Sequence, residues 1–443
     1  MVGRMRLKRV PRPDEPAPPP AVDTALVLSG GSVNGIYLQL GFLQVIRESE
    51  LWPAVGWVYG TSAGAFSGWA AARDAIDEHE RFLMGMQPEN VFEAHDLWRT
   101  PFVGLHRYAL PDSVAEQLGD PVEMARALRE GPRELTVVAI DIGLSPESAR
   151  SEDPYERAFS SRHDTPEAFA AALFASGAIS TFVLPLRIEE SVYGDGGWVR
   201  NFPLAYAYRE PAVHRIVGAR YRSSAIGFTG TGLHSWHHRM SRLSRVKMAR
   251  GVTAELREAI ERQSRGEPMH LIDTISRLSH IAVSRNSDLE VQLADERDRS
   301  LQALHDVREQ MRETITSVAR GRQRTELLAA LDESFAAADF PFRRSRVVPR
   351  LVVDLTTPEG VRLDVTRSRG TWSDEDKLAL VRHGRRLTEE ALESWAGLED
   401  APAAAGPAAD DGEAEAGAAP VPLPSTGSRR RRSPRRAGPR VPR

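Results

Sequence analysis

The fold is decided by the stretch from Thr24 to Gly35, which reads TALVL followed by SGGSVNG. The first five residues predict a short buried strand, and the next seven predict a glycine-rich loop. Residues 36–48 follow with apolar side chains at helical spacing, so we expect a helix there. A strand, a glycine loop and a helix in this order are typical of an α/β fold with a parallel sheet.

The same alternation continues along the chain. Strands are predicted at 57–59, 135–140 and 214–217, a strand pair at 182–188 and 191–193, and helices at 63–72 and 165–176. Three stretches without charge, 24–46, 51–72 and 168–186, are long enough to cross a bilayer. Small and polar residues interrupt each of them, which favours buried core over membrane spans. We therefore expect an α/β fold with a mainly parallel sheet covered by helices on both faces.

Five segments differ in composition. Residues 1–23 are basic and rich in proline, without the apolar run of a signal peptide, and 24–230 form the expected core. Residues 231–346 predict a charged helical insertion. Its apolar stripe from Leu301 to Val318 is expected to pack against the body in preference to a coiled coil. Residues 347–397 predict two closing strands, 351–355 and 361–365, and a helix capped by Ser373.

Residues 398–443 predict a disordered tail that is first rich in alanine and proline and then rich in arginine. The chain carries 58 basic and 61 acidic residues, a net charge of −3. The segments 1–23 and 399–443 hold 13 of the basic and 9 of the acidic residues, which leaves an acidic body of 45 against 52. The last sixteen residues hold eight arginines and no acid.

This charge distribution bears on partners and location. An arginine-rich tail is suited to peripheral contact with anionic membranes, although nucleic acid, or no partner at all, stays open for the tail. The mild net charge of the whole chain predicts no nucleic-acid partner. The absence of cysteine removes disulfides and thiolate chemistry and fits a reducing compartment, so we expect a cytoplasmic location, peripheral on membrane. The sequence does not determine the oligomeric state.

A candidate nucleophile lies in the segment GTSAG, which fits the pattern G-x-S-x-G with Ser62 at its centre. Gly60 and Gly64 flank the serine between a predicted strand and a predicted helix. A serine on such a turn projects its hydroxyl clear of the backbone, and the following helix directs N–H groups toward a developing oxyanion. The pentapeptide alone is moderate evidence, because a helix that begins with small residues can also serve packing.

The serine needs a base, and the sequence favours an aspartate. Asp195 follows a predicted strand and is surrounded by Gly194, Gly196 and Gly197, as at a site of close backbone approach or in a tight Asp-Gly turn. None of the 12 histidines has an obvious strand-end context. His234, His237 and His238 gather where a solvated surface is the simpler interpretation.

Gly30 and Gly31 end the first strand, where their backbone N–H groups could face an anion or an oxyanion. Neither nucleotide pattern, G-x-G-x-x-G or G-K-[ST], is present, which argues against a nucleotide site.

Together the glycine loop, the Ser62 elbow and the Asp195-Gly196-Gly197 motif resemble the patatin-like phospholipases. The segment from Ala175 to Pro185 and the positions of Asn201 and Pro203 resemble that family too. The resemblance covers about 24–230 and resumes at 347–397. It implies a lipid acyl hydrolase with a Ser62–Asp195 dyad and with Gly30 and Gly31 in the oxyanion hole. Gly35, Gly60, Gly64, Gly196 and Gly197 would support the site, and no metal or cofactor is implied.

Two residues depart from the family's loop. Ser32 stands where the third glycine is expected, and Asn34 where a basic residue is expected. Because one lost oxyanion donor costs about 2.7–4 kcal/mol of barrier in a well-studied protease, these changes bear on rate and selectivity. Two alternatives therefore accompany the hydrolase: an acyltransferase on the same fold, and a catalytically weak interaction protein.

Overall fold

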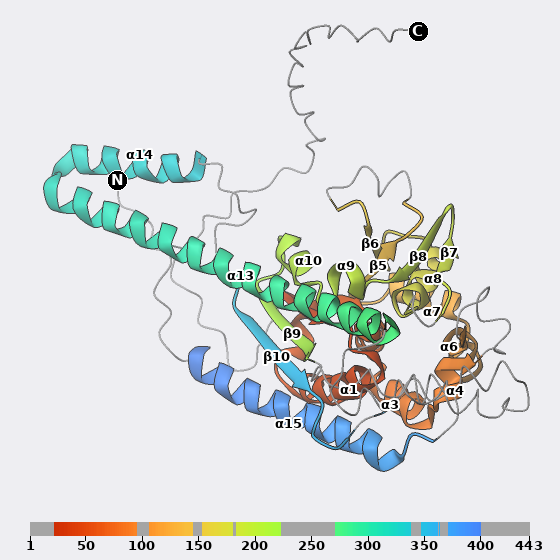
Figure 1. Ribbon diagram of the computed structural model, residues 1–443. Coiled ribbons are helices and arrows are strands. Elements are labelled where there is room, and N and C mark those ends of the chain that lie inside the picture. Colours follow the sequence, from red (N-terminus) through yellow and green to blue (C-terminus); the bar gives the residue numbers. More distant parts are fainter. Residues whose placement is uncertain are drawn as a thin grey trace, which may run out of the picture. The chain divides into compact units, whose positions relative to one another are not determined.

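A sheet of eight strands organises the residues that the computed structural model describes, which are 22–94, 106–144, 153–179, 183–222, 271–337, 347–361, 363 and 371–399 (Figure 1). The strands are β1 (Thr24–Leu28), β2 (Val55–Thr61), β5 (Glu134–Asp141), β6 (Glu156–Ser160), β7 (Leu186–Ile188), β8 (Ser191–Asp195), β9 (Arg215–Arg222) and β10 (Arg350–Thr356). Their order is β10-β9-β1-β2-β5-β8-β7, and β6 pairs with β5. The five strands from β10 to β5 are parallel, whereas β6 and β8 run antiparallel to β5.

One face of the sheet carries the larger apolar core. It is covered by α1 (Ser32–Glu48), α2 (Ala63–Ala72), α8 (Pro166–Ser176) and α15 (Asp374–Glu399). Leu26 and Leu28 of β1 point into this core and are fully buried. α15 crosses α1 closely: a Cβ at Gly41 would overlap with the carbonyl of Val381, and a Cβ at Gly384 with that of Leu38.

The opposite face of the sheet is covered by α10 (Leu204–Arg209) and α13 (Leu271–Val318). Ala25 and Val27, which alternate with Leu26 and Leu28 along β1, pack there with Phe202, Ile216 and Ala294. A strand buried on both faces reads as a continuous apolar run, which explains its uncharged sequence. The predicted α/β architecture, with helices on both faces of a mostly parallel sheet, is therefore confirmed.

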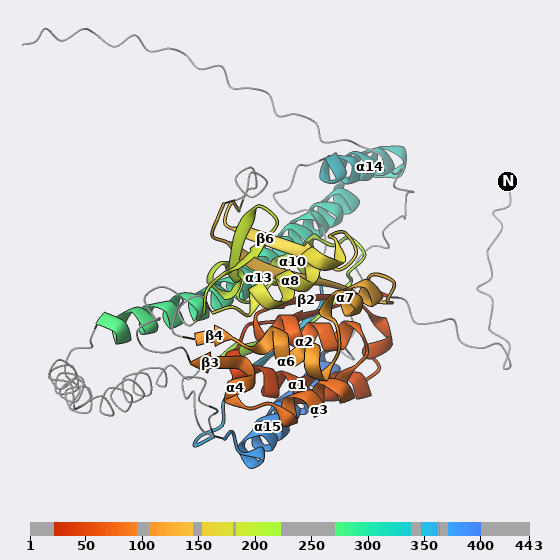
Figure 2. The same cartoon turned by 90° about the vertical axis from the view of Figure 1, so that its right-hand side faces the viewer.

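Between α1 and β5 the chain adds elements that were not predicted from the sequence. They are η1 (Trp52–Ala54), α3 (Ile76–Gly85), α4 (Pro88–Val91), β3 (Phe92–Ala94), β4 (His106–Tyr108), α6 (Leu110–Gln117) and α7 (Pro121–Arg129). Figure 2 shows α3, α4 and α6 beside α1 and α2. Short α9 (Gly197–Arg200) follows β8 directly.

Two local predictions were wrong. The loop expected at 29–35 is shorter, because α1 begins at Ser32 and not at Ile36. The second closing strand, expected at 361–365, is not formed at Val361 or Leu363, while 362, 364 and 365 lie outside the described residues. There the side-chain amide of Asn34 takes the place of a neighbouring strand, because it bonds both backbone groups of Leu363.

The helical insertion also differs from expectation. Leu301 of α13 is buried, but Val307 and Met311 are each 48% exposed and Val318 is 75% exposed. These three residues of the stripe therefore do not pack on the body. Instead α14 (Gly321–Ala337) turns back along this end of α13, joined by ion pairs from Arg308 and Arg312 to Asp332 (Figure 1). The boundary predicted at 230–231 and the tail predicted at 398–443 fall on residues that are almost all outside the description.

The uncharged runs that could have crossed a bilayer belong to the sheet and to the buried helices α1, α2 and α8. Within the described part of the chain, none of the helices combines the length and the apolar character that a membrane span requires.

Candidate active site

Ser62 lies at the sharp turn between β2 and α2. Its backbone has φ 54° and ψ −123°, a strained conformation for a residue with a side chain. The flanking glycines allow this turn. A Cβ at Gly60 would overlap with the carbonyl of Gly64, and one at Gly64 would overlap with the carbonyl of Leu28. The G-x-S-x-G spacing thus has a steric cause in this chain.

The Ser62 hydroxyl donates a hydrogen bond of 2.8 Å to Oδ2 of Asp195. Asp195 ends β8, which pairs with β5 on the side opposite β2, so the sheet brings the two residues together from 133 positions apart. The other carboxylate oxygen, Oδ1, accepts 2.8 Å from the N–H of Gly197. Both side chains are buried, at 7% exposure.

Burial changes the acidity of this carboxyl group. It raises the pKa of Asp195 to about 6, although the hydrogen bonds from Gly197 and Ser62 act in the opposite direction. A base with a pKa near 6 is mostly ionised at pH 7 and yet takes up a proton more readily than an ordinary aspartate. The site therefore pairs the Ser62 hydroxyl, as hydrogen-bond donor, with a carboxylate whose pKa is raised toward neutral pH.

A second serine fixes the elbow. The N–H of Ser62 donates to Oγ of Ser176 at 2.9 Å, and the Ser176 hydroxyl donates to the carbonyl of Val138 at 2.6 Å. Ser176 is fully buried at the end of α8. This role could not be predicted, because a serine at the end of an alanine-rich helix carries no local signal for it.

The backbone N–H groups of the glycine loop differ in whether they already have a hydrogen-bond partner. The Gly30 N–H donates to the carbonyl of Asn201 at 2.9 Å, so it faces Asn201 and not an incoming substrate. A Cβ at Gly30 would lie 3.2 Å from Cβ of Ser62. Among the described residues, the N–H groups of Gly31 and Ser32 have no hydrogen-bond partner.

The two residues that depart from the family pattern have distinct environments. Ser32 has φ 53°, the left-handed region that favours glycine. Asn34 lies in the first turn of α1, where its amide nitrogen donates to the Leu363 carbonyl at 3.1 Å and its amide oxygen accepts from the Leu363 N–H at 2.9 Å. Gly35, in the same turn, donates its N–H to the carbonyl of Gly31 at 2.8 Å.

The glycines after the aspartate are also sterically required. A Cβ at Gly196 would overlap with the carbonyl of Val138 on β5. At Gly197 it would lie 3.0 Å from both Oδ1 of Asp195 and Oδ1 of Asn201. The nine residues of the predicted site thus lie in three segments, 30–35, 60–64 and 195–197, that meet around Ser62. Within them the Gly30 N–H is already bonded.

An apolar cavity of about 60 Å³ adjoins Ser62. Its wall comes from α1, α2, α3, α4 and α6 and includes Phe66, Trp69, Phe82, Leu83 and Met86. Such a lining suits a hydrocarbon chain. Half of this wall comes from residues between 73 and 117, where no elements were predicted from the sequence, so the cavity could not be anticipated.

Two buried polar side chains in the cavity wall were also missed. The Tyr108 hydroxyl has no hydrogen-bond partner among the described residues, and burial together with the charge of Asp195 raises its pKa. Neither ring nitrogen of His79 has a partner within the same described part, and burial lowers its pKa to about 4. His214 is exposed, and His234, His237 and His238 lie outside the described residues.

Two comparisons link the chain to known proteins. Residues 26–208, which contain the glycine loop, Ser62 and Asp195, match the family model described as patatin-like phospholipase. This domain is similar to the patatin-like phospholipases, whose members are lipid hydrolases. The chain is also similar to VipD from Legionella pneumophila at 12% identity, covering 85% of this chain and 67% of that chain with a TM-score of 0.39. No curated protein shows significant similarity to the sequence.

Proposed function

We propose that the protein hydrolyses carboxylic esters of lipid acyl chains with Ser62 as nucleophile and Asp195 as base. The observation that carries the proposal is the 2.8 Å hydrogen bond from the Ser62 hydroxyl to Asp195, beside an apolar cavity. The family supports lipid hydrolysis in general. The geometry of the two side chains supports the finer assignment.

In the proposed first step, Oγ of Ser62 forms a bond to the ester carbonyl carbon while Asp195 takes the hydroxyl proton. The carbonyl oxygen becomes an oxyanion. When this intermediate collapses, the bond to the alcohol breaks, and the alcohol leaves with the proton from Asp195. The acyl group then remains on Ser62 as an ester.

Water completes the cycle. A water oxygen attacks the acyl carbon while Asp195 takes a proton from that water. The proton passes from Asp195 to Oγ of Ser62 when the free acid leaves. The pKa of Asp195, about 6, suits both directions of this transfer near neutral pH.

The oxyanion would be held by the N–H groups of Gly31 and Ser32 and by the amino end of α2. The Gly30 N–H is not included, because it donates to Asn201. The hydrocarbon part of the acyl group would occupy the cavity beside Phe66 and Trp69, which leaves the alcohol or head group on the open side of Ser62.

The test is hydrolysis of soluble and lipid esters by the wild type, Ser62→Ala and Asp195→Asn, with product analysis for transfer to an added alcohol. Both variants should lose at least about a thousandfold in kcat. His79→Leu is the matched control, since it changes a buried histidine of the cavity whose ring nitrogens have no partner in the described chain. Loss of activity in His79→Leu equal to that in Ser62→Ala would replace the dyad with a histidine-dependent mechanism. Activity retained by Ser62→Ala would refute the proposal.

A further inference from the structure

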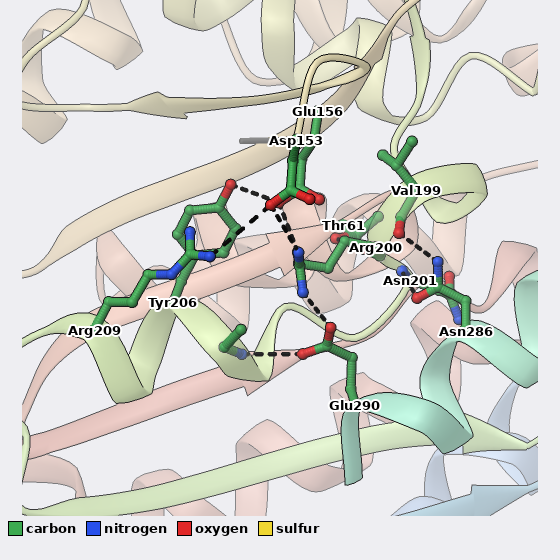
Figure 3. Close-up of polar contacts among 11 residues, drawn as sticks. Thr61, Asp153, Glu156, Val199, Arg200, Asn201, Tyr206, Arg209, Asn286 and Glu290 are labelled. Carbon is green, nitrogen blue, oxygen red and sulfur yellow. Dashed lines mark hydrogen bonds and ion pairs between the residues drawn. The ribbon is translucent and has the colours of Figure 1, made fainter. Parts of the chain in front are cut away.

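α13 contacts the loop that follows Asp195. This loop, residues 196–201, contains α9, and Figure 3 shows Asn286 and Glu290 of α13 directed toward Val199, Arg200 and Asn201. Asn286, Ser287 and Glu290 lie one turn apart or adjacent on α13, so they share one face of the helix. This face belongs to the helical insertion, which lies outside the matched residues 26–208.

The backbone of the loop is held by two side chains of α13. Oδ1 of Asn286 accepts from the N–H of Asn201 at 3.2 Å, while its amide nitrogen donates to the carbonyl of Val199. Oγ of Ser287, which is 2% exposed, accepts from the side-chain amide of Asn201 at 2.7 Å. The backbone N–H and the side-chain amide of Asn201 are thereby both bonded to α13.

A buried charge network makes the third connection (Figure 3). The Arg200 guanidinium donates to Glu156 at 2.6 Å and to Glu290 of α13. The second oxygen of Glu290 accepts from the N–H of Ala205 at 3.1 Å. Because Arg200 lies between two carboxylates that are almost fully buried, it cannot move without leaving charges unpaired.

On its inner side the same loop contacts Asp195 and the neighbours of Ser62 and Gly31. Its Arg200 carbonyl accepts from the hydroxyl of Thr61, the residue before Ser62, at 2.9 Å. Its Asn201 carbonyl accepts from the Gly30 N–H at 2.9 Å. Its Gly197 N–H donates to Asp195 at 2.8 Å. A shift of the loop would therefore move the nucleophile, the glycine loop and the base relative to one another.

We infer that α13 positions the Ser62–Asp195 pair by holding loop 196–201, with Asn286, Ser287 and Glu290 as positioning residues. This inference rests on the proposed function. α13 contributes no residue to the lining of the cavity in the described chain, so its effect should fall on the chemical step and not on binding of the acyl chain.

The direction of each effect follows from the contacts. A displacement of about 1 Å at a reacting group can cost about a hundredfold in rate, so Asn286→Ala should lower kcat about tenfold or more and leave KM within about twofold. A loosened loop also admits water to Asp195. A weaker Gly197 hydrogen bond acts in the opposite direction and raises the pKa of Asp195. Because burial is the largest influence on this pKa, the acid limb of the pH profile should move to lower pH.

The experiment compares Asn286→Ala and Glu290→Gln with Asp298→Asn as a matched control. Asp298 also ties α13 to the body through a buried ion pair, 2.8 Å from Arg350, but it does not contact loop 196–201. For each protein, kcat, KM, the pH profile of kcat/KM and the unfolding midpoint are measured with one soluble ester. The first two variants should lose kcat and shift the acid limb, while the control should lose stability alone.

A second readout does not depend on catalysis. Amide hydrogen exchange of residues 196–201 should be faster in Asn286→Ala than in the wild type and unchanged in Asp298→Asn. Unchanged exchange in Asn286→Ala, or kcat and acid limb equal to those of the control, would overturn the positioning role. A wild type without Ser62-dependent hydrolysis would instead refute the proposed function, and the exchange result would still decide whether α13 holds the loop.

Discussion

The hydroxyl of Ser62 and the carboxylate of Asp195 are joined by a 2.8 Å hydrogen bond between two strands that are separated in the sheet by β5 alone. No histidine takes part in this bond. The carboxylate is buried, which raises its pKa to about 6 and makes it a stronger base than a solvated aspartate. The consequences of that pKa can be measured both in catalysis and in folding.

The first prediction concerns the rate. Because the ionised form of Asp195 is the proposed base, kcat/KM for an uncharged soluble ester should rise with pH and reach half its plateau near pH 6. His79→Leu should keep the same acid limb, since the pKa of His79 is about 4. An acid limb near pH 4, or a limb that disappears in His79→Leu, would contradict this assignment.

The second prediction concerns stability. The pKa of Asp195 rises on folding from 3.8 to about 6, so the folded state holds the proton more tightly. Ionisation therefore costs stability as the pH rises from about 4 to about 6, by up to about 3 kcal/mol. Asp195→Asn removes this cost and should raise the free energy of unfolding above pH 6, but not below pH 4. Urea unfolding at pH 4 and pH 8 measures the difference, and an equal effect at both values would count against a buried, ionised Asp195.

The third prediction concerns Ser32, whose φ of 53° is unusual for a residue with a Cβ. Left-handed backbone costs about 1–2 kcal/mol for such a residue, while glycine adds about 0.5–1 kcal/mol of unfolded-state entropy. Ser32→Gly should therefore raise the free energy of unfolding by up to about 1 kcal/mol and preserve or increase kcat.

Ser32→Ala is the control for the Ser32 hydroxyl, because it keeps the Cβ and the strain. Wild-type activity in Ser32→Ala would show that the hydroxyl is not needed, and a gain in Ser32→Gly alone would trace that gain to the relieved backbone. If both lost most of their activity, the hydroxyl would have a role of its own, and the view of Ser32 as a tolerated departure from glycine would be wrong.

The sequence predicted those parts of the fold in which local pattern and burial agree. β1 and α2 have the predicted bounds, because the uncharged run of β1 is buried on both faces and α2 begins directly after the strained Ser62. The start of α1 was missed because a left-handed Ser32 does not resemble a helix start. The second closing strand was wrong because Leu363 bonds with Asn34, 329 positions away, which no local pattern records.

The candidate site shows the same division. Ser62, Asp195 and their glycines could be recognised, because close backbone contacts require glycine at fixed positions of these short motifs. Tyr108 and His79 could not, because their place in the cavity wall depends on how α3 and β4 are arranged around it. The connection from α13 to loop 196–201 was equally hidden, because it joins residues about 85 positions apart through side chains of ordinary surface type.

The last prediction concerns the tail, where the final sixteen residues hold eight arginines and no acid. A lipid hydrolase must reach an interface, and each basic residue near an anionic surface contributes about 1 kcal/mol at low salt. A variant that ends at Leu398 should therefore lose salt-sensitive binding to anionic vesicles and keep its rate on a soluble ester. Neutral vesicles at the same two salt concentrations are the control, because they offer no counterion release. If the shortened protein binds anionic vesicles as well as the full chain does, the tail has no part in reaching the lipid. If the full chain binds nucleic acid more tightly than anionic vesicles at equal salt, the arginines serve a different partner.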